Sequence, residues 1–344
     1  MAFPIKILLI EPESRSAMFL LGNVLLFMYM MFFVISWPYI IIYLIVQIII
    51  FQRVNQHLRS GRSYVPTTNL NNQTVIVTGA ATGIGRATAL ELAKLRARVI
   101  IGIRNQARAE RIAQELSKQC NGNVIGYHLD LSDLSSVKDF AQKIDKVDIL
   151  INNAGVVKRQ KEYTKDGLEA TFGTNHIGHF YLTHLLLPLL IKSHGRIVNV
   201  SSVMHIFSKE DTDFIQNRSY NTIIAYADSK LANIFHATEL QRRYGDQGVR
   251  AYALHPGTIA STELGGGKGP LETVLTSPFQ ILSKSMPQGA MTTLFCALSD
   301  EAQPGKYHSD CRITPASPLA SNSRKAQELW ELSEKIINDK TKSF

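Results

Sequence analysis

The sequence predicts an α/β fold in which helices cover both faces of a doubly wound parallel sheet. Apolar stretches of strand length recur along the chain, and stretches with helical periodicity separate them. Strands that are apolar throughout are typical of parallel sheets buried on both faces. The second observation is a glycine-rich turn at residues 78–85, directly after the first predicted strand. Such a turn commonly opens sheets of this class.

Predicted strands and helices alternate from residue 74 onward. The first strand covers residues 74–77, and the helix after it covers 85–96, where Ala89, Leu92 and Leu95 recur at helical spacing. The later predicted strands cover residues 98–103, 124–129, 147–151, 196–200 and 249–254. We therefore expect residues 71–344 to form a single domain.

Residues 17–51 contain no Asp, Glu, Lys, Arg or His, which predicts a membrane segment. The stretch exceeds the apolar region of a cleaved secretory signal, so we expect an uncleaved anchor. As one helix it would extend about 52 Å, against a hydrocarbon core of about 30 Å. Pro38 offers a kink, which leaves one tilted span or a re-entrant hairpin open. A buried helix of a soluble core is disfavoured because the apolar character is not confined to one face.

The regions that flank this segment differ in charge. Residues 1–16 form a tail in which basic and acidic side chains balance, whereas residues 52–70 form a polar linker whose charged residues are arginines. The residues concerned are Lys6, Glu11, Glu13 and Arg15 before the segment, and Arg53, Arg59 and Arg62 after it. This positive bias predicts that the C-terminal domain is cytosolic.

Composition narrows the class of protein. The chain is 45% hydrophobic and carries a formal net charge of +9, which suits an anionic cofactor or membrane surface. No basic run interleaved with aromatic residues is present, so we expect no nucleic-acid partner. The three cysteines, Cys120, Cys296 and Cys311, lack metal-ligand spacing and predict neither a disulfide framework nor a zinc site.

The glycine-rich turn predicts a nucleotide site. Gly79, Gly83 and Gly85 occupy positions where the backbone passes close to a pyrophosphate, at the positive end of the following helix. The spacing G-x-x-x-G-x-G, set between a strand and a helix, indicates a Rossmann-type domain with a dinucleotide at its switch point.

Tyr226 and Lys230 form a second constellation. Residues four apart on a helix share one face, so the Lys230 charge can lie near the Tyr226 hydroxyl. A nearby cation favours the phenolate, and we therefore expect a lowered Tyr226 pKa and acid/base chemistry. The spacing alone is weak evidence, because it recurs on ordinary solvated helices.

Taken together, the motifs resemble those of the short-chain dehydrogenases/reductases, in that family's order. They are Thr78–Gly85, Asp130–Leu131, Asn152–Gly155, Asn175, Ser202, Tyr226 with Lys230, and Pro256–Gly257. Further stretches look like the retinol dehydrogenase-like branch, namely residues 175–180, 196–202, 229–233, 255–258 and 308–311. The resemblance covers residues 74–260 and implies an oxidoreductase that uses a nicotinamide cofactor.

The resemblance also implies roles for single residues. Tyr226 would exchange a proton with the carbinol oxygen, Lys230 would lower its pKa and bind the nicotinamide ribose, and Ser202 would hydrogen-bond the substrate oxygen, with Ser201 as the fallback. Asn175 would hold a water that links Lys230 to solvent. The expected cofactor contacts are Gly79, Thr82, Gly83, Ile84, Gly85, Arg86, Arg104, Asp130, Leu131, Asn153, Ala154, Gly155, Tyr226, Lys230, Pro256, Gly257 and Thr258.

Each polar residue also has a structural interpretation. Asn175 can bridge helices, Ser202 can end a strand, and the turn at residues 152–155 can hold adjacent strands together. Asp130, which resembles the family's adenine-contacting aspartate, can instead cap the helix ahead of Asp133.

The charges near the second predicted strand favour NADP(H). An NAD site needs a carboxylate about 20 residues after the glycine turn, whereas a 2′-phosphate needs a cation. No Asp or Glu occurs between Leu92 and Ala109, while Arg104 follows the strand and Arg86 follows Gly85. Simple surface exposure is the competing interpretation of both arginines.

The remaining expectations concern surroundings and substrate. Residues 257–285 are glycine-rich and predict a lid over the substrate. His176, His179 and His255 have no carboxylate or Cys at ligand spacing, so no metal is expected. We expect a lipophilic alcohol or carbonyl substrate; the resemblance favours a retinoid, and a steroid or a fatty aldehyde stays open. The expected location is a membrane of the endoplasmic reticulum or a lipid droplet, and a homodimer is also open. The alternative from another class is a membrane scaffold that keeps the fold without turnover.

Overall fold

The computed structural model describes residues 18, 21–26, 41–51, 62–209, 220–257 and 284–342. The eight strands within these residues form one sheet, ordered β3-β2-β1-β4-β5-β6-β7-β8. Their bounds are β1 Thr74–Thr78, β2 Arg98–Ile103, β3 Asn123–His128, β4 Ile149–Asn152, β5 Arg196–Val200, β6 Arg250–His255, β7 Tyr307–Ser309 and β8 Arg312–Ile313. All neighbours pair in parallel except β8, which runs antiparallel to β7.

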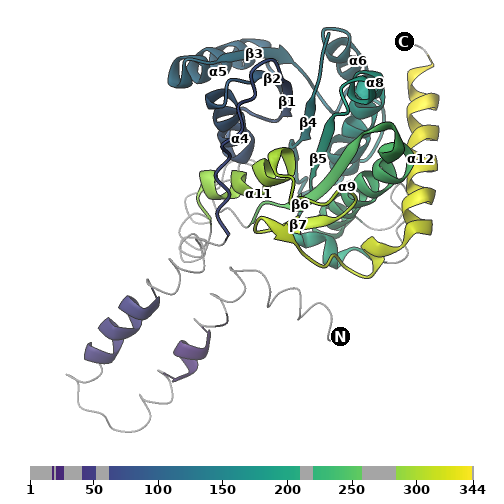
Figure 1. Cartoon of the computed structure of the whole chain (residues 1–344). Helices are drawn as coiled ribbons and strands as arrows, with labels where there is room; N and C mark the ends of the chain where they lie inside the picture. Colours follow the sequence, from purple (N-terminus) through teal and green to yellow (C-terminus); the bar gives the residue numbers. More distant parts are fainter. Residues whose placement is uncertain are drawn as a thin grey trace.

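Helices cover both faces of this sheet (Figure 1). The α-helices are α4 Gly83–Lys94, α5 Gln106–Cys120, α6 Leu134–Ala141, α7 Ala170–Phe172, α8 Gly178–Lys192, α9 Thr222–Tyr244, α11 Met286–Leu298 and α12 Ser323–Thr341. Shorter turns are the π-helix η1 Gly173–Ile177 and the 3₁₀ helices η2 Val203–Phe207, η3 Gly245–Gln247 and η4 Leu319–Ser321. The predicted doubly wound α/β class is confirmed for the described domain.

The strands place successive side chains in two different cores, because side chains alternate across a sheet. In β1, Ile76 packs with residues of α6, α8, α9 and α12. Val75 and Val77 pack on the opposite face with residues of α4, α5 and α11. This burial on both faces explains why the strand reads as one continuous apolar run.

The predicted strand positions agree closely with the structure. Residues 98–103 and 196–200 are strands with the expected bounds, and the other four predicted strands differ from the observed ones by one or two residues. The sequence did not predict β7 and β8, which have three and two residues. Strands this short carry no periodic pattern, so only their pairing at the sheet edge defines them.

The polar linker predicted for residues 52–70 is partly wrong within residues 62–70. Leu70 is buried, and its backbone N–H donates to the Leu95 carbonyl at 2.8 Å. The Tyr64 ring packs edge-on against Phe295 of α11, with ring centroids 5.5 Å apart. Isolated apolar residues in a polar stretch thus attach its C-terminal part to the domain.

The predicted membrane segment falls largely outside the described residues. Residues 21–26 and 41–51 are helical, and apolar side chains such as Leu21 and Ile42 are exposed. None of the helices within the described residues is both long and apolar enough to cross a membrane. The choice between one span and a hairpin stays a prediction.

Candidate active site

One cavity lies at the carboxyl ends of the parallel strands and has a volume of about 640 Å³. Both the nucleotide motifs and the acid/base motifs contribute to its wall. The predicted site residues that line it are Gly79, Thr82, Gly83, Ile84, Gly85, Arg104, Asp130, Leu131, Asn153, Ala154, Gly155, Ser202, Tyr226, Lys230, Pro256 and Gly257. Thr258 and most of the predicted lid, residues 258–283, lie outside the described residues.

The glycine turn connects β1 to α4 and brings backbone to the cavity wall. Gly79 and Gly83 have φ of 68° and 63°, a left-handed conformation that side chains disfavour. A Cβ on Gly79 would lie 2.7 Å from the Ala154 Cα, and one on Gly85 would overlap the Asn153 side chain. Thr82 caps α4 without a side-chain hydrogen bond, so no side chain caps the helix amides there. The turn therefore fits the pyrophosphate of a dinucleotide.

Asn153 joins the ends of β1 and β4. Its backbone N–H donates to Thr78 Oγ1 at 2.9 Å, and its Nδ2 donates to the Thr78 carbonyl at 2.8 Å. The Ala154 N–H also donates to Thr78 Oγ1, at 3.0 Å. The structural interpretation of this turn is thus observed, and Thr78 is a site residue that sequence reasoning gave no role of its own.

The basic residues near β2 separate into two groups. Arg104 and Arg108 line the cavity with exposed side chains, and neither forms an ion pair with another described residue. Arg86 does not line it, because its Nη2 pairs with Glu115 Oε2 of α5 at 3.2 Å. The expected cofactor contact of Arg86 is therefore not supported. Arg108 was missed, although it lies only four residues beyond Arg104, in the first turn of α5.

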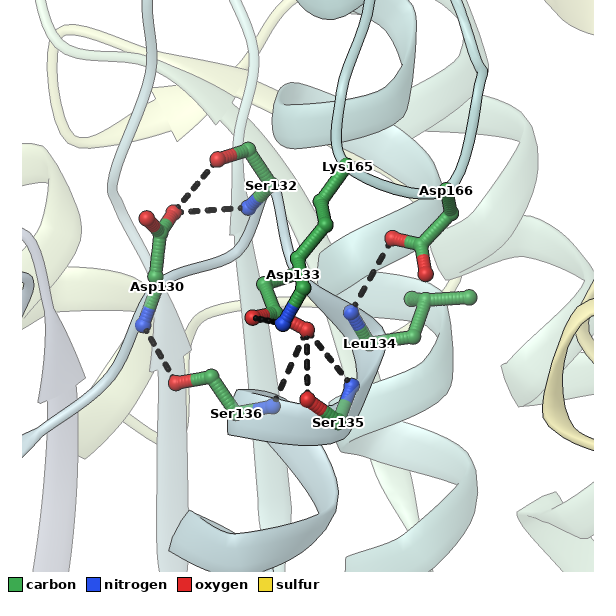
Figure 2. Close-up of polar contacts among 8 residues, drawn as sticks. All are labelled: Asp130, Ser132, Asp133, Leu134, Ser135, Ser136, Lys165 and Asp166. Atoms are coloured by element: carbon green, nitrogen blue, oxygen red, sulfur yellow. Dashed lines mark hydrogen bonds and ion pairs between the residues drawn. The ribbon is translucent and has the colours of Figure 1, made fainter. Parts of the chain in front are cut away.

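Asp130 follows β3 and lines the cavity. Figure 2 shows it hydrogen-bonded to Ser132 and to Ser136 of α6. Its Oδ1 accepts from Ser132 N at 2.9 Å and from Ser132 Oγ at 2.6 Å. The N-cap of α6 is Asp133, which accepts from Ser135 N and Ser136 N. The cap interpretation of Asp130 is therefore wrong, because α6 begins at Leu134 and its N-cap is Asp133.

Tyr226 and Lys230 lie one turn apart on α9, and both line the cavity. Lys230 Nζ donates to the Val200 carbonyl at 3.0 Å and lies 5.5 Å from the centroid of the Tyr226 ring. Burial lowers the pKa of Lys230 to about 8. Burial raises the pKa of Tyr226 to about 12, and a hydrogen bond with Ser202 opposes that rise.

The prediction that Lys230 lowers the Tyr226 pKa is therefore wrong for the protein without a bound cofactor. Lys230 is buried and Tyr226 is half-buried, and loss of water disfavours both the ammonium and the phenolate. The Lys230 ammonium is directed to a backbone carbonyl of β5 rather than to the phenol oxygen. At neutral pH the protein by itself holds Tyr226 protonated, as an acid rather than a base.

The two adjacent serines have different partners. Ser201 Oγ donates to the Lys230 carbonyl at 2.7 Å, which anchors α9 to the end of β5. Ser202 contacts Tyr226 and accepts a hydrogen bond from Met204 N at 3.2 Å. The hydroxyl that contacts Tyr226 is thus that of Ser202, as the resemblance implied. Ser201, the fallback, hydrogen-bonds to the backbone instead.

Asn175 lies in the π-helical turn η1 and is fully buried. Its Oδ1 accepts from Val156 N at 2.7 Å, and its Nδ2 donates to the Val156 carbonyl at 2.9 Å and to Ser229 Oγ at 3.0 Å. Asn175 is not in the cavity wall, where its neighbour Thr174 lies instead. Its side chain bridges chain segments, so the expected contact with a water stays a prediction.

The histidines considered as metal ligands have protein partners. His176 Nε2 lies 2.9 Å from Ser333 Oγ of α12, and His179 bridges Thr78 Oγ1 at 2.8 Å and the Asn175 carbonyl at 2.9 Å. Burial lowers the pKa of His176 to about 3 and that of His179 to about 4, so both rings are neutral at pH 7. Within the described part of the chain, no three His, Cys, Asp or Glu residues are grouped to hold a metal ion.

Comparison with known proteins agrees with this geometry. The family model described as short chain dehydrogenase matches residues 73–270. Retinol dehydrogenase 12 of Mus musculus is 41% identical over 284 residues, which cover 79% of this chain and 89% of that protein. Retinol dehydrogenase 13 of Homo sapiens is 41% identical over 280 residues, covering 77% and 84%.

Solved structures share the fold. An uncharacterized protein from Mycobacterium paratuberculosis superposes with a TM-score of 0.65 at 34% identity, covering 81% of this chain and 98% of that one. A short chain dehydrogenase from Salmonella enterica gives a TM-score of 0.53 at 25% identity, covering 72% and 99%. The motifs, the sheet order and these similarities together show that the chain belongs to the short-chain dehydrogenase family, among relatives named retinol dehydrogenases.

Proposed function

We propose that this protein is a membrane-anchored NADP(H)-dependent oxidoreductase that interconverts a lipophilic, retinoid-like alcohol and its carbonyl. The observation that carries the proposal is the convergence of Ser202, Tyr226 and Lys230 with the glycine turn on one cavity. The family supplies the reaction class, and the relatives named retinol dehydrogenases supply the substrate class.

A bound nicotinamide cofactor supplies the hydride in reduction and accepts it in oxidation. The protein groups position the carbonyl and move the proton. Ser202 Oγ orients the carbonyl oxygen beside Tyr226, and the Tyr226 hydroxyl donates its proton to that oxygen as the carbinol forms. The tyrosinate that remains is stabilised by the charge of Lys230, whose Nζ lies 5.5 Å from the ring centroid.

The raised Tyr226 pKa favours the reductive direction. A phenol with a pKa of about 12 is already protonated at pH 7 and is ready to act as an acid. Oxidation must begin from the phenolate, which burial disfavours. We therefore expect carbonyl reduction to be the faster direction when both cofactor forms are saturating.

NADP(H) is favoured by the cations on the β2 side of the cavity. Arg104 and Arg108 line the wall with exposed side chains, and neither is paired with a described acidic residue. A 2′-phosphate adds negative charge beside these guanidinium groups, which bind phosphate oxygens well. The β2 end has no carboxylate to accept from a ribose 2′-hydroxyl.

The lipophilic substrate class has one physical argument from the chain itself. An apolar segment at residues 17–51 would hold the catalytic domain next to lipid, where retinoid-like substrates dissolve. The linker arginines favour a cytosolic domain, and we propose the endoplasmic reticulum or a lipid droplet as its location.

The test is a turnover assay of the purified full chain in mild detergent. Retinal, a steroid ketone and a long-chain aldehyde are each offered with NADPH and with NADH, and cofactor oxidation is followed by absorbance. We expect reduction of retinal with NADPH at a higher kcat/KM than with NADH. If no carbonyl is turned over with either cofactor, the enzyme proposal is wrong and a catalytically silent scaffold is the better interpretation.

A further inference from the structure

His205 is buried and links two segments that are far apart in sequence. It lies in η2, three residues after Ser202, and its side chain is 0% exposed. One ring nitrogen, Nδ1, is 2.7 Å from the Ser202 carbonyl oxygen. The other, Nε2, is 3.0 Å from the backbone nitrogen of Ser317. The imidazole thus spans the gap between the Ser202 turn and the segment before η4.

The partners determine which nitrogen carries the proton. A backbone N–H can only donate, so His205 Nε2 must be the acceptor of the Ser317 bond. In a neutral imidazole the other nitrogen is then the donor, and Nδ1–H donates to the Ser202 carbonyl. Burial lowers the pKa of His205 to about 4, which keeps the ring neutral at pH 7. Tyr307 packs edge-on at a centroid distance of 4.9 Å and restricts the ring further.

These bonds act on the backbone of Ser202. Its carbonyl accepts from His205 Nδ1 and also from the His205 backbone N–H at 3.2 Å. Its Oγ accepts from Met204 N at 3.2 Å as the N-cap of η2. Since the hydroxyl and the carbonyl of Ser202 are both held by this one short turn, the orientation of Oγ toward Tyr226 depends on how η2 is anchored.

Ser317 brings a distant part of the chain into this arrangement. It lies between β8 and η4, beyond residue 270 where the match to the short chain dehydrogenase model ends. Its own Oγ accepts from Ala320 N at 3.2 Å, which fixes the segment locally. The C-terminal extension of the domain therefore reaches the turn that carries Ser202.

We propose that His205 is a positioning residue: its Nδ1–H fixes the carbonyl of Ser202, and the Ser317 N–H holds the ring in the tautomer that can do so. The inference rests on the proposed function, because it needs Ser202 to orient a substrate carbonyl. His205 acts through Ser202 and does not itself contact the reacting atoms.

Two substitutions of His205 test the roles of Nδ1 and Nε2 separately. His205→Asn places an amide donor near the position of Nδ1 and loses the acceptor for Ser317. His205→Gln places its amide near the position of Nε2 and loses the donor to Ser202. We expect kcat for carbonyl reduction to fall by about 10- to 100-fold in His205→Gln, since small displacements of a reacting geometry have effects of this size. We expect His205→Asn to recover most of that loss, while the Kd for NADPH stays unchanged in both.

The control is His184→Gln, an exposed histidine on α8, for which we expect wild-type kinetics. A cycle with Ser202→Ala then tests the route of action: His205→Gln should cause no further loss of kcat in that background, because its effect passes through Ser202. Circular dichroism and thermal melts check that each variant is folded.

The outcomes separate the two proposals. If wild type reduces no carbonyl, the proposed function has failed. The inference is wrong, and His205 is structural, if wild type is active but His205→Asn and His205→Gln lose the same activity. It is also wrong if His205→Gln lowers kcat by the same factor in the Ser202→Ala background as in wild type. Recovery in Asn together with a vanishing effect in Ser202→Ala establishes the positioning role.

Discussion

The two halves of the cavity wall differ in residue type and in exposure to water. At the ends of β1 and β2, the wall consists of glycine backbone and of exposed cations such as Arg104 and Arg108. At the end of β5 and on α9, it consists of polar side chains with little access to water: Ser202 and Lys230 are buried, and Tyr226 is half-buried. The first half is suited to bind a charged ligand from solvent, and the second to carry out proton transfer where solvent does not compete.

This difference affects the electrostatics of the site. Burial shifts the pKa of Tyr226 upward to about 12 and that of Lys230 downward to about 8. On the nucleotide side, by contrast, the guanidinium groups of Arg104 and Arg108 are exposed and stay hydrated. Substitutions in the two halves should therefore change different quantities: cofactor affinity on one side, and turnover or stability on the other.

The largest expected effect is that of Tyr226→Phe in the buried half. Loss of the hydroxyl removes the proton donor, so kcat for carbonyl reduction should fall by about 10² to 10⁴-fold. The Kd for NADPH, measured by quenching of protein fluorescence, should change little, because the ring and its neighbours remain. A variant that keeps more than half of the wild-type kcat would show that another group moves the proton.

On the nucleotide side, Gly85→Ala should abolish measurable cofactor binding. The added Cβ would overlap Asn153 Nδ2 and lie 2.7 Å from the Gly79 carbonyl oxygen, so the turn that meets the pyrophosphate must shift. Gly245→Ala is the matched control, because its Cβ meets only the flexible side chain of Gln241. Calorimetric titration with NADPH measures the Kd of both variants. Equal affinities in Gly85→Ala and Gly245→Ala would contradict the close-packing argument.

Lys230→Met tests the energetic consequence of burying a charge. The folded pKa of Lys230, about 8, is below the ordinary value of 10.5, so the folded state binds fewer protons than the unfolded state between these values. Wild-type stability should therefore rise from pH 8 to 10.5, and the charged side chain should be destabilising below pH 8. At pH 7 the inactive Met variant should be more stable by about 1 to 3 kcal/mol, from about 1.4 kcal/mol per pKa unit less the lost hydrogen bond.

Denaturant unfolding of the full chain at pH 7 and pH 10 measures this difference. The exposed Lys192→Met on α8 serves as control and should shift stability little at either pH. A Lys230→Met variant that is less stable than wild type at pH 7 would mean that the bond to Val200 outweighs desolvation.

The smallest effect should come from the exposed arginines. Arg104→Ala and Arg108→Ala should each raise the KM for NADPH by about 10-fold, the scale of one charge-assisted contact, and leave the KM for NADH nearly unchanged. Arg86→Ala should alter neither, because that side chain is paired with Glu115 outside the cavity wall. Steady-state kinetics with both cofactors measures the two KM values. An equal rise in the KM for NADH would show that these arginines do not act through the 2′-phosphate.

Much of the domain could be predicted from local pattern. Continuous apolar runs gave the six longer strands, because strands buried on both faces need apolar side chains at every position. Left-handed backbone at Gly79 and Gly83 restricts those positions to glycine, so the turn is readable in the sequence. The short β7 and β8 were missed, since two or three residues form a strand only when a neighbouring edge is there to pair with.

Site residues were predictable as a set but not in their individual settings. Arg86 and Arg104 look alike in the sequence, and only the position of Glu115 on α5 separates the paired one from the one in the cavity. Likewise, the sequence left a helix cap open as the role of Asp130, and only the structure showed that Asp133 caps α6. The bond between His205 and Ser317 joins residues 112 positions apart, and no local pattern marks it.

The sequence by itself determined the strand and helix order, the glycine turn and the identities of the groups that carry the chemistry, because these follow from residue type and short spacing. Only the tertiary structure decided the protonation of those groups and their neighbours. Packing buries Lys230, leaves Tyr226 half-buried beside it and directs the Lys230 ammonium to a backbone carbonyl. Desolvation therefore sets both pKa values in directions that spacing alone did not predict.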